Sequence, residues 1–368
     1  MTRFPALAVV ICKMNSTISQ CIAGYAADAL NSLSPAQIDF LRKLPKAELH
    51  AHLNGCIPIQ TLQALAQERL LSSSSLPTEV QAGIERLQNG IVLNEIHEFF
   101  GLFPAIYALT SAPEPLAVAA RAVLTQFLEP SLENGDYPQA AYLELRSTPR
   151  ETPEMTRLKY IETVLDEVEK YPAEKAALIV SLDRRMSDDV AKECVECAVT
   201  LKKAGRRVVG MDLCGDPLAG NMEEFAKHYR TAKKAGLRVT VHIAETKGSH
   251  VADTLQLLDF QPDRLGHATF LDAAQKDFVC NSKIGVEICL SSNLLCKTVP
   301  TLEDHHISHY LKHNHPIAIC TDDTLPFRNS LISEYALLLA APPVGLGLRE
   351  DDVERIARMG MECRFKST

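Results

Sequence analysis

Short apolar runs rich in β-branched residues recur eight times along this chain of 368 residues, and a stretch with helical periodicity follows most of them. The runs occupy residues 47–50, 141–145, 177–182, 208–213, 239–243, 264–267, 286–290 and 317–320. Continuous apolar strands that alternate with amphipathic helices indicate parallel strands with both faces covered. Eight such units predict an α/β chain folded as a (β/α)8 TIM-type barrel.

The domain organisation follows from this layout. We expect one barrel domain over residues 33–368, preceded at 1–32 by a poorly constrained extension that is helical around 21–30. The longest connection, about 57–139, carries helical patterns and is expected to form a cap over the barrel mouth. Arg3 and the apolar run 4–12 resemble a short signal peptide, but the run is brief and Lys13 interrupts it. No stretch reaches the ~18 apolar residues of a membrane span, so no membrane partner is expected.

Charge and cysteine content narrow the function classes. The net charge is −8 and no basic stripe or tryptophan is present, which disfavours nucleic acid as a partner. Eleven cysteines lie scattered without framework spacing, which favours a reducing compartment and a cytoplasmic protein. Cys194 and Cys197 form a C-x-x-C without a second pair, so a metal role there is disfavoured. We expect a monomer that acts on a small molecule.

Polar residues follow nearly every predicted strand. In a barrel of this kind the chemistry lies at the carboxyl ends of the strands. Here the runs end in His50-Ala51-His52, Arg146-Ser147-Thr148, Asp183, Cys214-Gly215-Asp216, the segment 242–245, His267, Ser291-Ser292-Asn293 and Thr321-Asp322-Asp323. This agreement supports the strand assignment independently of the count of eight.

A metal site is the first chemistry that these strand ends predict. His50 and His52 place two imidazoles on one face of a strand, because side chains alternate with period two. His242 and Asp322 add a third imidazole and a carboxylate from other strand ends. Three histidines and one carboxylate suit a divalent first-row metal, and zinc, one Zn2+ per chain, is the default without redox chemistry. Each histidine alone could instead be a hydrogen-bonded structural residue, as we expect for His305, His306, His309, His313 and His315.

Three further ionisable residues accompany the predicted ligands. They are Glu245, His267 and Asp323. A zinc ion lowers the pKa of its water toward about 7. Hydrolysis then needs one group to take or steer the water proton and another to protonate the substrate. The three residues meet that need.

Six ordered motifs resemble the adenosine deaminase family over roughly residues 33–358. They are LPKAELHAHLNG (44–55), DLCGD (212–216), HIAE (242–245), RLGH (264–267), SSN (291–293) and TDD (321–323). The run YLELRSTPR (142–150) resembles the adenosine deaminase-like branch, whose members deaminate N6-methyl-AMP. Tyr107 stands where that branch usually has a histidine, and TLPF (324–327) replaces a small or glycine-containing turn.

The resemblance implies roles for individual residues. His50, His52, His242 and Asp322 would bind zinc, and Glu245 would donate a proton to purine N1. His267 would orient or deprotonate the water, two roles that stay open. Asp323 would contact N7 and the Gly215 N–H would contact N3. Ribose and phosphate would be held by Asn54, Tyr107, Asp183 and the segment Ser147, Thr148 and Arg150.

A phosphate subsite also has support from the residues themselves. Arginine offers a planar fork of donors to a nearly dianionic phosphate monoester. Arg146, Arg150 and the hydroxyls of Ser147 and Thr148 follow the second strand, with Arg184, Arg185 and Lys297 as further candidates. The structural alternatives are an ion pair for Arg146 and a solvated loop position for Arg150.

The sequence therefore predicts hydrolytic deamination of N6-methyl-AMP to IMP and methylamine. An adenosine deaminase that acts on the nucleoside is the first alternative, and a non-catalytic purine-binding protein is the second. The cytidine-deaminase fold is disfavoured because its H-x-E and P-C-x-x-C signature does not occur.

Overall fold

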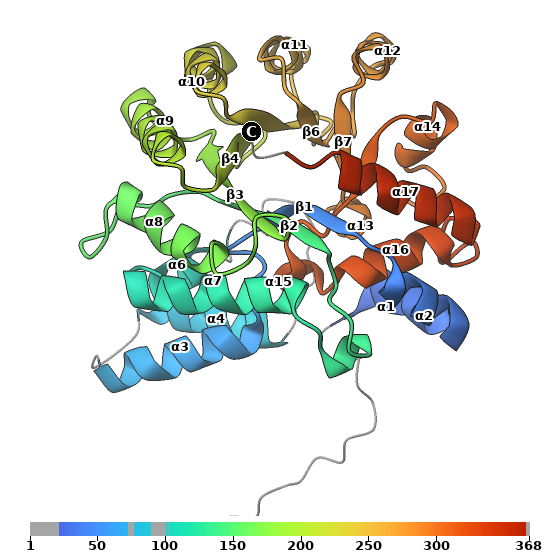
Figure 1. Cartoon of the computed structure of the whole chain (residues 1–368), viewed down its shortest axis with the longest axis horizontal. Coiled ribbons are helices and arrows are strands. Elements are labelled where there is room, and N and C mark those ends of the chain that lie inside the picture. Colours follow the sequence, from blue (N-terminus) through green and yellow to red (C-terminus); the bar gives the residue numbers. More distant parts are fainter. Residues whose placement is uncertain (1–21, 73–76, 90–100, 102, 366–368) are drawn as a thin grey trace, which may run out of the picture.

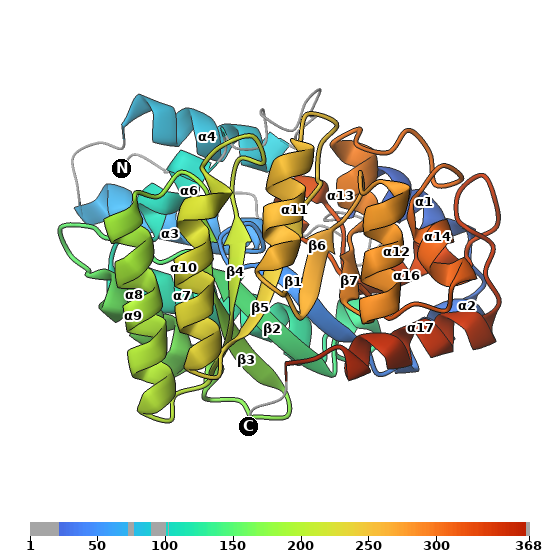
Figure 2. The same cartoon turned by 90° about the horizontal axis from the view of Figure 1, so that it is seen from above.

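Eight parallel strands form the centre of the computed structural model, which describes residues 22–72, 77–89, 101 and 103–365 (Figures 1 and 2). The strands pair in chain order, each with the next. They are β1 (Ala47–His52), β2 (Tyr142–Ser147), β3 (Ala176–Asp183), β4 (Val208–Cys214), β5 (Arg238–Ile243), β6 (Arg264–His267), β7 (Gly285–Ile288) and β8 (Ile317–Ile319). The predicted TIM-type barrel is confirmed.

The barrel closes where its last strand returns to its first. Ala51 and Asp322 form a parallel bridge there. The N–H of Asp322 donates to the carbonyl of His50 at 2.8 Å, and the N–H of His52 donates to the carbonyl of Asp322 at 3.2 Å. Glu48 fastens the same seam, since its carboxylate accepts the N–H groups of His50 and Thr321, both at 2.9 Å. The seam between β1 and β8 therefore runs through predicted metal ligands.

A ring of helices covers the outside of the barrel (Figure 1). Along the chain it comprises α8 (Arg157–Val168), α9 (Asp188–Lys203), α10 (Met222–Lys234), α11 (Val251–Asp259), α12 (Ala273–Ser282), α14 (Ile307–Lys312), α16 (Leu331–Leu339) and α17 (Glu350–Glu362). The short helices α13 (Leu290–Leu295) and α15 (Thr324–Phe327) follow β7 and β8 and contribute Ser292 and Phe327 to the pocket at the mouth. One large apolar cluster fills the space between strands and helices, and a smaller one fills the barrel interior.

Helix α9 shows how the sequence defines one of these helices. The Ser187 hydroxyl caps its first turn by accepting the N–H of Val190, and acidic residues begin the helix while lysines end it. Its apolar side chains recur on one face and are buried, Cys194 among them. Cys197 is partly buried, and both thiols are free. This C-x-x-C serves helix packing.

The long connection between β1 and β2 is helical. It contains α3 (Ile59–Ser72), α4 (Thr78–Asn89), α6 (Phe103–Leu109), α7 (Pro113–Leu128) and the 3-10 turn η1 (Leu132–Asn134). Residues 73–76, 90–100 and 102 of the predicted cap lie outside the described residues. Phe103 and Tyr107 of α6 reach the pocket at the barrel mouth, so this connection contributes to the site.

Residues 22–32, which the sequence analysis assigned to the N-terminal extension, contain the helix expected around 21–30 and contact the barrel domain. Helix α1 (Gly24–Ser32) precedes α2 (Pro35–Lys43) and buries Ala26, Ala29 and Leu30. The N–H of Ala23 also donates to the carbonyl of Arg328 at 2.9 Å. In Figure 1, α1 lies beside α16, whose residues are all buried. Residues 1–21 lie outside the described part of the chain.

Two local expectations also change. The seventh strand ends at Ile288, and Ser291, Ser292 and Asn293 lie in α13. The segment TLPF forms the short helix α15, with Pro326 in its first turn. A proline fits there because the first N–H groups of a helix have no partner within the helix. Within the described residues, no helix combines the length and apolar character that a bilayer crossing needs.

Helix α1 allows a test of whether residues 24–32 belong to the barrel domain. Leu30→Ala should lower the free energy of unfolding by about 2–4 kcal/mol, because it removes a buried side chain and leaves a cavity. Urea denaturation followed by circular dichroism measures the change. Tyr25→Ala on the same helix is the control, since Tyr25 is 47% exposed; its expected change is under about 0.5 kcal/mol. Equally small effects of both variants would mean that α1 is a dispensable extension.

Candidate metal and catalytic site

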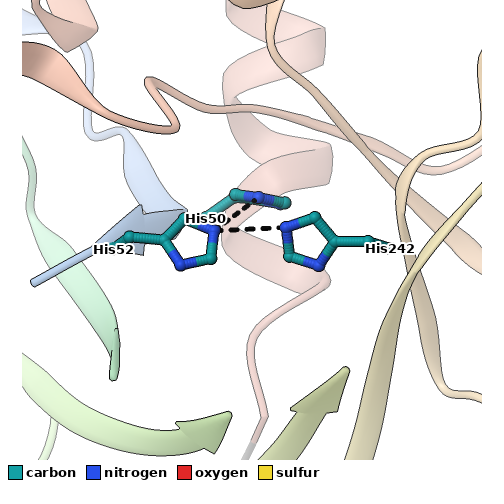
Figure 3. A group of neighbouring side chains, drawn as sticks. All are labelled: His50, His52 and His242. Atoms are coloured by element: carbon teal, nitrogen blue, oxygen red, sulfur yellow. Dashed lines mark hydrogen bonds between the residues drawn. The ribbon is translucent and has the colours of Figure 1, made fainter. Parts of the chain in front are cut away.

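Three imidazoles from two strands converge at the barrel mouth (Figure 3). His50 and His52 belong to β1, and His242 belongs to β5. The Nε2 atom of His52 lies 3.3 Å from that of His50 and 3.2 Å from that of His242. Three ring nitrogens this close together are suited to sharing one cation.

Asp322 completes this group from the end of β8. Its Oδ1 lies 3.7 Å from the Nε2 atoms of both His50 and His52. Its Oδ2 lies 3.9 Å from the Nε2 of His267. The backbone of Asp322 is left-handed, with φ of 64°, a strained conformation that recurs at functional sites. All four predicted ligands therefore lie together.

Two buried carboxylates bind the Nδ1 atoms of His50 and His242, on the side of each ring away from the cluster of Nε2 atoms. Glu287 on β7 accepts from His50 Nδ1 at 2.7 Å, and Asp212 on β4 accepts from His242 Nδ1 at 3.0 Å. A proton on Nδ1 leaves the Nε2 lone pair free for a metal, and such carboxylate partners are usual behind metal-bound histidines. Asp212 and Glu287 had no assigned role in the sequence analysis. Their signal was a charged residue inside an apolar strand, which needs a buried partner.

The electrostatics of the cluster favour neutral ligands on β1. Burial holds the pKa of His50 well below its usual value, with a further contribution from Arg146. Burial likewise lowers the pKa of His52 to about 3. Burial opposes protonation of His242 too, but Asp212 outweighs it and raises that pKa. Because three imidazoles and one carboxylate form the donor set, the residues fit a divalent first-row metal.

Glu245 and His267 face the same space as the ligands. The Oε1 of Glu245 lies 3.8 Å from the Nε2 of His267. Both line the pocket at the mouth, and His267 has a left-handed backbone with φ of 61°. His306 donates to the carbonyl of His267 at 2.8 Å and so supports this backbone.

Asp323 lies beside them in the same pocket. It is 3% exposed, and its Oδ1 atom has no hydrogen-bond partner among the described residues. Burial raises the pKa of Asp323 well above its usual value, and the nearby carboxylates of Asp322 and Glu245 add to the effect. An unpartnered buried carboxyl of this kind is free to contact a ligand in the pocket.

Most of the predicted substrate contacts line this pocket. They are Asn54, Tyr107, Arg146, Ser147, Thr148, Asp183, Gly215 and Asp323. Gly215 has a φ of 95°, and a Cβ there would lie 2.7 Å from Oδ1 of Asp183, so a glycine is needed at this point of the wall. Ser147 shares a hydrogen bond with the hydroxyl of Tyr160 at 2.7 Å.

Arg146 lies deeper than a phosphate contact at the mouth requires. Its side chain has no exposed surface and donates to Glu287 at 2.8 Å. It lies 3.4 Å from Asp212 and also donates to the carbonyl of Leu49. The positive charge of Arg146 thus offsets the negative charges of Asp212 and Glu287. This position agrees with the ion-pair alternative and not with a phosphate contact.

Arg150 is also engaged by the protein. It donates to the carbonyl of Tyr107 at 3.1 Å and to the hydroxyl of Thr110 at 2.9 Å. Its guanidinium lies 4.0 Å from the centre of the Tyr107 ring. Arg150 is absent from the pocket lining. It orients α6, and through α6 the ring of Tyr107.

Arg185 is the cation that the pocket presents to solvent. Its side chain is 55% exposed and forms a two-pronged ion pair with Asp183, at 2.9 Å from Nε and 2.5 Å from Nη2. Among the described residues the only other arginine or lysine of the lining is the buried Arg146.

The histidines between β7 and β8 have structural partners. His305 shares a hydrogen bond with Asn293 at 3.1 Å, and His315 donates to the carbonyl of Ile284 at 2.7 Å. His313 donates to the carbonyl of His309 at 2.8 Å. In the described part of the chain, none of them belongs to a group with metal-binding geometry.

Comparison with known proteins identifies the family of the chain. Residues 45–368 match the profile of the family described as adenosine deaminase. A protein named N6-methyl-AMP deaminase from Homo sapiens is 36% identical over 318 residues, which cover 82% of this chain and 84% of that protein.

The chain is also similar to solved structures of N6-mAMP deaminase. The crystal structure of an Arabidopsis N6-mAMP deaminase has a TM-score of 0.78 at 31% identity, with 89% of this chain and 96% of that chain covered. Arabidopsis ADAL complexed with IMP has a TM-score of 0.77 at 31% identity, with 89% and 94% covered. The chain therefore belongs to the adenosine deaminase family and is a metal-dependent purine deaminase.

Proposed function

We propose that the protein hydrolyses N6-methyl-AMP to IMP and methylamine, with one zinc ion held by His50, His52, His242 and Asp322. The observation that carries the proposal is one pocket lined by three of the ligand residues, His52, His242 and Asp322, and also by the acid Glu245 and the half-exposed Arg185. The fourth ligand residue, His50, lies 3.3 Å from His52, measured between their Nε2 atoms. The similarity to proteins named N6-methyl-AMP deaminase and to a structure with IMP supports the choice of a nucleotide.

The residues divide the reaction among themselves. When bound, the zinc ion supplies a water molecule whose pKa is lowered toward about 7. Glu245 donates a proton to N1 of the purine, which makes C6 electrophilic. His267 lies between Glu245 and Asp322, at 3.8 and 3.9 Å, where it can orient the water or take its proton. Water adds at C6, and the bond from C6 to the exocyclic nitrogen breaks, so that methylamine leaves with the transferred protons.

Polar groups of the pocket wall fix the purine ring. The unpartnered Oδ1 of Asp323 supports a contact with N7, and the left-handed turn at Gly215 supports a backbone contact with N3. The amide oxygen of Asn54 also lacks a partner among the described residues and is assigned to the ribose. These contacts orient C6 toward the ligand cluster.

Arg185 is assigned to the phosphate, together with Thr148. Arg146 and Arg150 form hydrogen bonds with protein groups, whereas Arg185 forms an ion pair with Asp183 and is 55% exposed. A phosphate monoester carries more charge than Asp183 and can accept the same fork of donors. The nucleotide would therefore replace Asp183 at the guanidinium and free that carboxylate for the ribose.

A comparison of substrates tests the proposed function directly. We expect kcat/KM to be higher for N6-methyl-AMP than for AMP, and higher for either than for adenosine. Steady-state release of methylamine or ammonia measures the three rates. A preference for adenosine would identify a nucleoside deaminase, and absence of turnover in zinc-loaded protein would identify a non-catalytic purine-binding protein. Both outcomes contradict the proposal.

Substitution of the acid separates catalysis from metal binding. Glu245→Gln should keep about one zinc per chain and lose several orders of magnitude in kcat, because the donor to N1 is gone. Asp322→Ala serves for comparison, because this variant should bind zinc more weakly and retain less than one zinc per chain. Metal analysis of the dialysed variants and single-turnover kinetics give both readouts. Substantial residual turnover in Glu245→Gln would exclude its assigned role.

The phosphate contact has its own test. Arg185→Gln should lower kcat/KM for N6-methyl-AMP roughly 10- to 100-fold, as expected for a lost hydrogen bond to a charged group. It should change turnover of N6-methyladenosine less than about threefold. Arg238→Gln is a matched control, because Arg238 is 52% exposed, pairs with Asp263 and begins β5 at the far end of the barrel. Equal losses for nucleotide and nucleoside would remove Arg185 from the phosphate site.

A further inference from the structure

The end of the barrel opposite the mouth is filled by the segment that follows α17. Phe365 is 4% exposed and belongs to the apolar cluster inside the barrel, where it packs with residues of the strand starts. Gly210 on β4 leaves room for it, since a Cβ there would lie 2.8 Å from the Phe365 ring. We call residues 363–365 the plug.

Polar contacts fasten the plug to charges inside the barrel. The N–H of Phe365 donates to the carboxylate of Glu144 at 2.6 Å. Arg264 donates to the carbonyl of Cys363 at 2.8 Å, and its guanidinium lies 3.6 Å from the centre of the Phe365 ring. Arg264 also donates to Glu144 at 2.6 Å. The plug therefore fixes one arginine by a carbonyl, a ring face and a shared carboxylate.

That arginine reaches the metal ligands through a single carboxylate. Arg264 Nε donates to Oε1 of Glu287 at 2.7 Å. The other oxygen of Glu287 accepts from His50 Nδ1 at 2.7 Å. A continuous series of hydrogen bonds thus joins the plug to the imidazole of His50 at the mouth.

Water exclusion is a condition of this series. The side chains of Glu144 and Glu287 have no exposed surface, and that of Arg264 is 2% exposed. Charged hydrogen bonds are strongest where water is absent, and the orientation of a metal-bound histidine depends on its outer partner. Opening the lower end of the barrel would hydrate Arg264 and Glu144 and loosen Glu287.

We propose that the plug is part of the metal site, with Phe365 a positioning residue that acts through Arg264 and Glu287 on His50. The proposal needs a bound metal ion but does not depend on which purine is the substrate. Loss of an outer partner typically weakens metal binding 10- to 100-fold. For Phe365, which lies two contacts beyond Glu287, we expect a loss of about tenfold.

The test measures zinc affinity rather than activity. Zinc-loaded Phe365→Ala is titrated with a competing chelator and is expected to bind Zn2+ about tenfold more weakly than the unaltered chain. Phe225→Ala is the matched control. Phe225 is also 4% exposed, but it is a residue of α10 and belongs to the apolar cluster between the strands and the helices. It should bind Zn2+ within twofold of the unaltered chain.

Two results overturn the proposal. One is unchanged zinc affinity in Phe365→Ala, and the other is an equal loss in both variants, which would reflect general destabilisation. If an alanine variant does not fold, Phe365→Leu and Phe225→Leu replace the pair, with an expected threefold loss for the first and none for the second. Turnover of N6-methyl-AMP by the unaltered chain is measured alongside. A failure of the proposed substrate is thereby separated from a failure of the plug.

Discussion

The carboxylate of Glu287 is the point on which the interior of this barrel depends. It lies on β7 with no exposed surface and accepts from four groups, which belong to His50, Arg146, Thr240 and Arg264. Burial alone would raise its pKa, but the two arginines outweigh it and lower the pKa to about 2. The carboxylate therefore stays ionised, and each partner strand is fixed to β7 by a charge-assisted hydrogen bond. Removing either arginine would leave part of this buried negative charge uncompensated, which is a destabilising change.

The mouth and the lower end of the barrel divide the polar residues by task. Groups above the histidines, such as Asp323 and Asn54, line the pocket and each keep an oxygen without a hydrogen-bond partner among the described residues. Groups below the histidines, such as Arg264 and Glu144, form hydrogen bonds with each other and with backbone groups of residues 363–365. A site of this kind is rigid where it holds the ligands and open where it meets the substrate, as preorganised catalysis requires.

The sequence predicted the barrel and the grouping of its ligands because both follow from periodicity. His50 and His52 share one side of β1 by period-two alternation, and the carboxyl ends of parallel strands share one mouth. The side chain of Arg146 was not predictable in this way. Its level on β2 depends on the register, in which Arg146 pairs with His52, and its partner Glu287 is 141 residues away in the chain. Separation along the chain also hid the roles of Asp212 and Glu287, which lie 30 and 237 residues from the histidines that they hold. A charged residue inside an apolar strand marked both.

The seam between β1 and β8 carries a consequence for folding. His50 and His52 lie on the β1 side of the seam, and Asp322 lies on the β8 side. Few backbone hydrogen bonds join the two sides. An ion bound by both sides cross-links the first and last strands, so metal binding and barrel closure share one free energy. The metal-free chain should then open first at this seam. Amide hydrogen exchange would report the difference as a local loss of protection, while the remaining strands keep theirs.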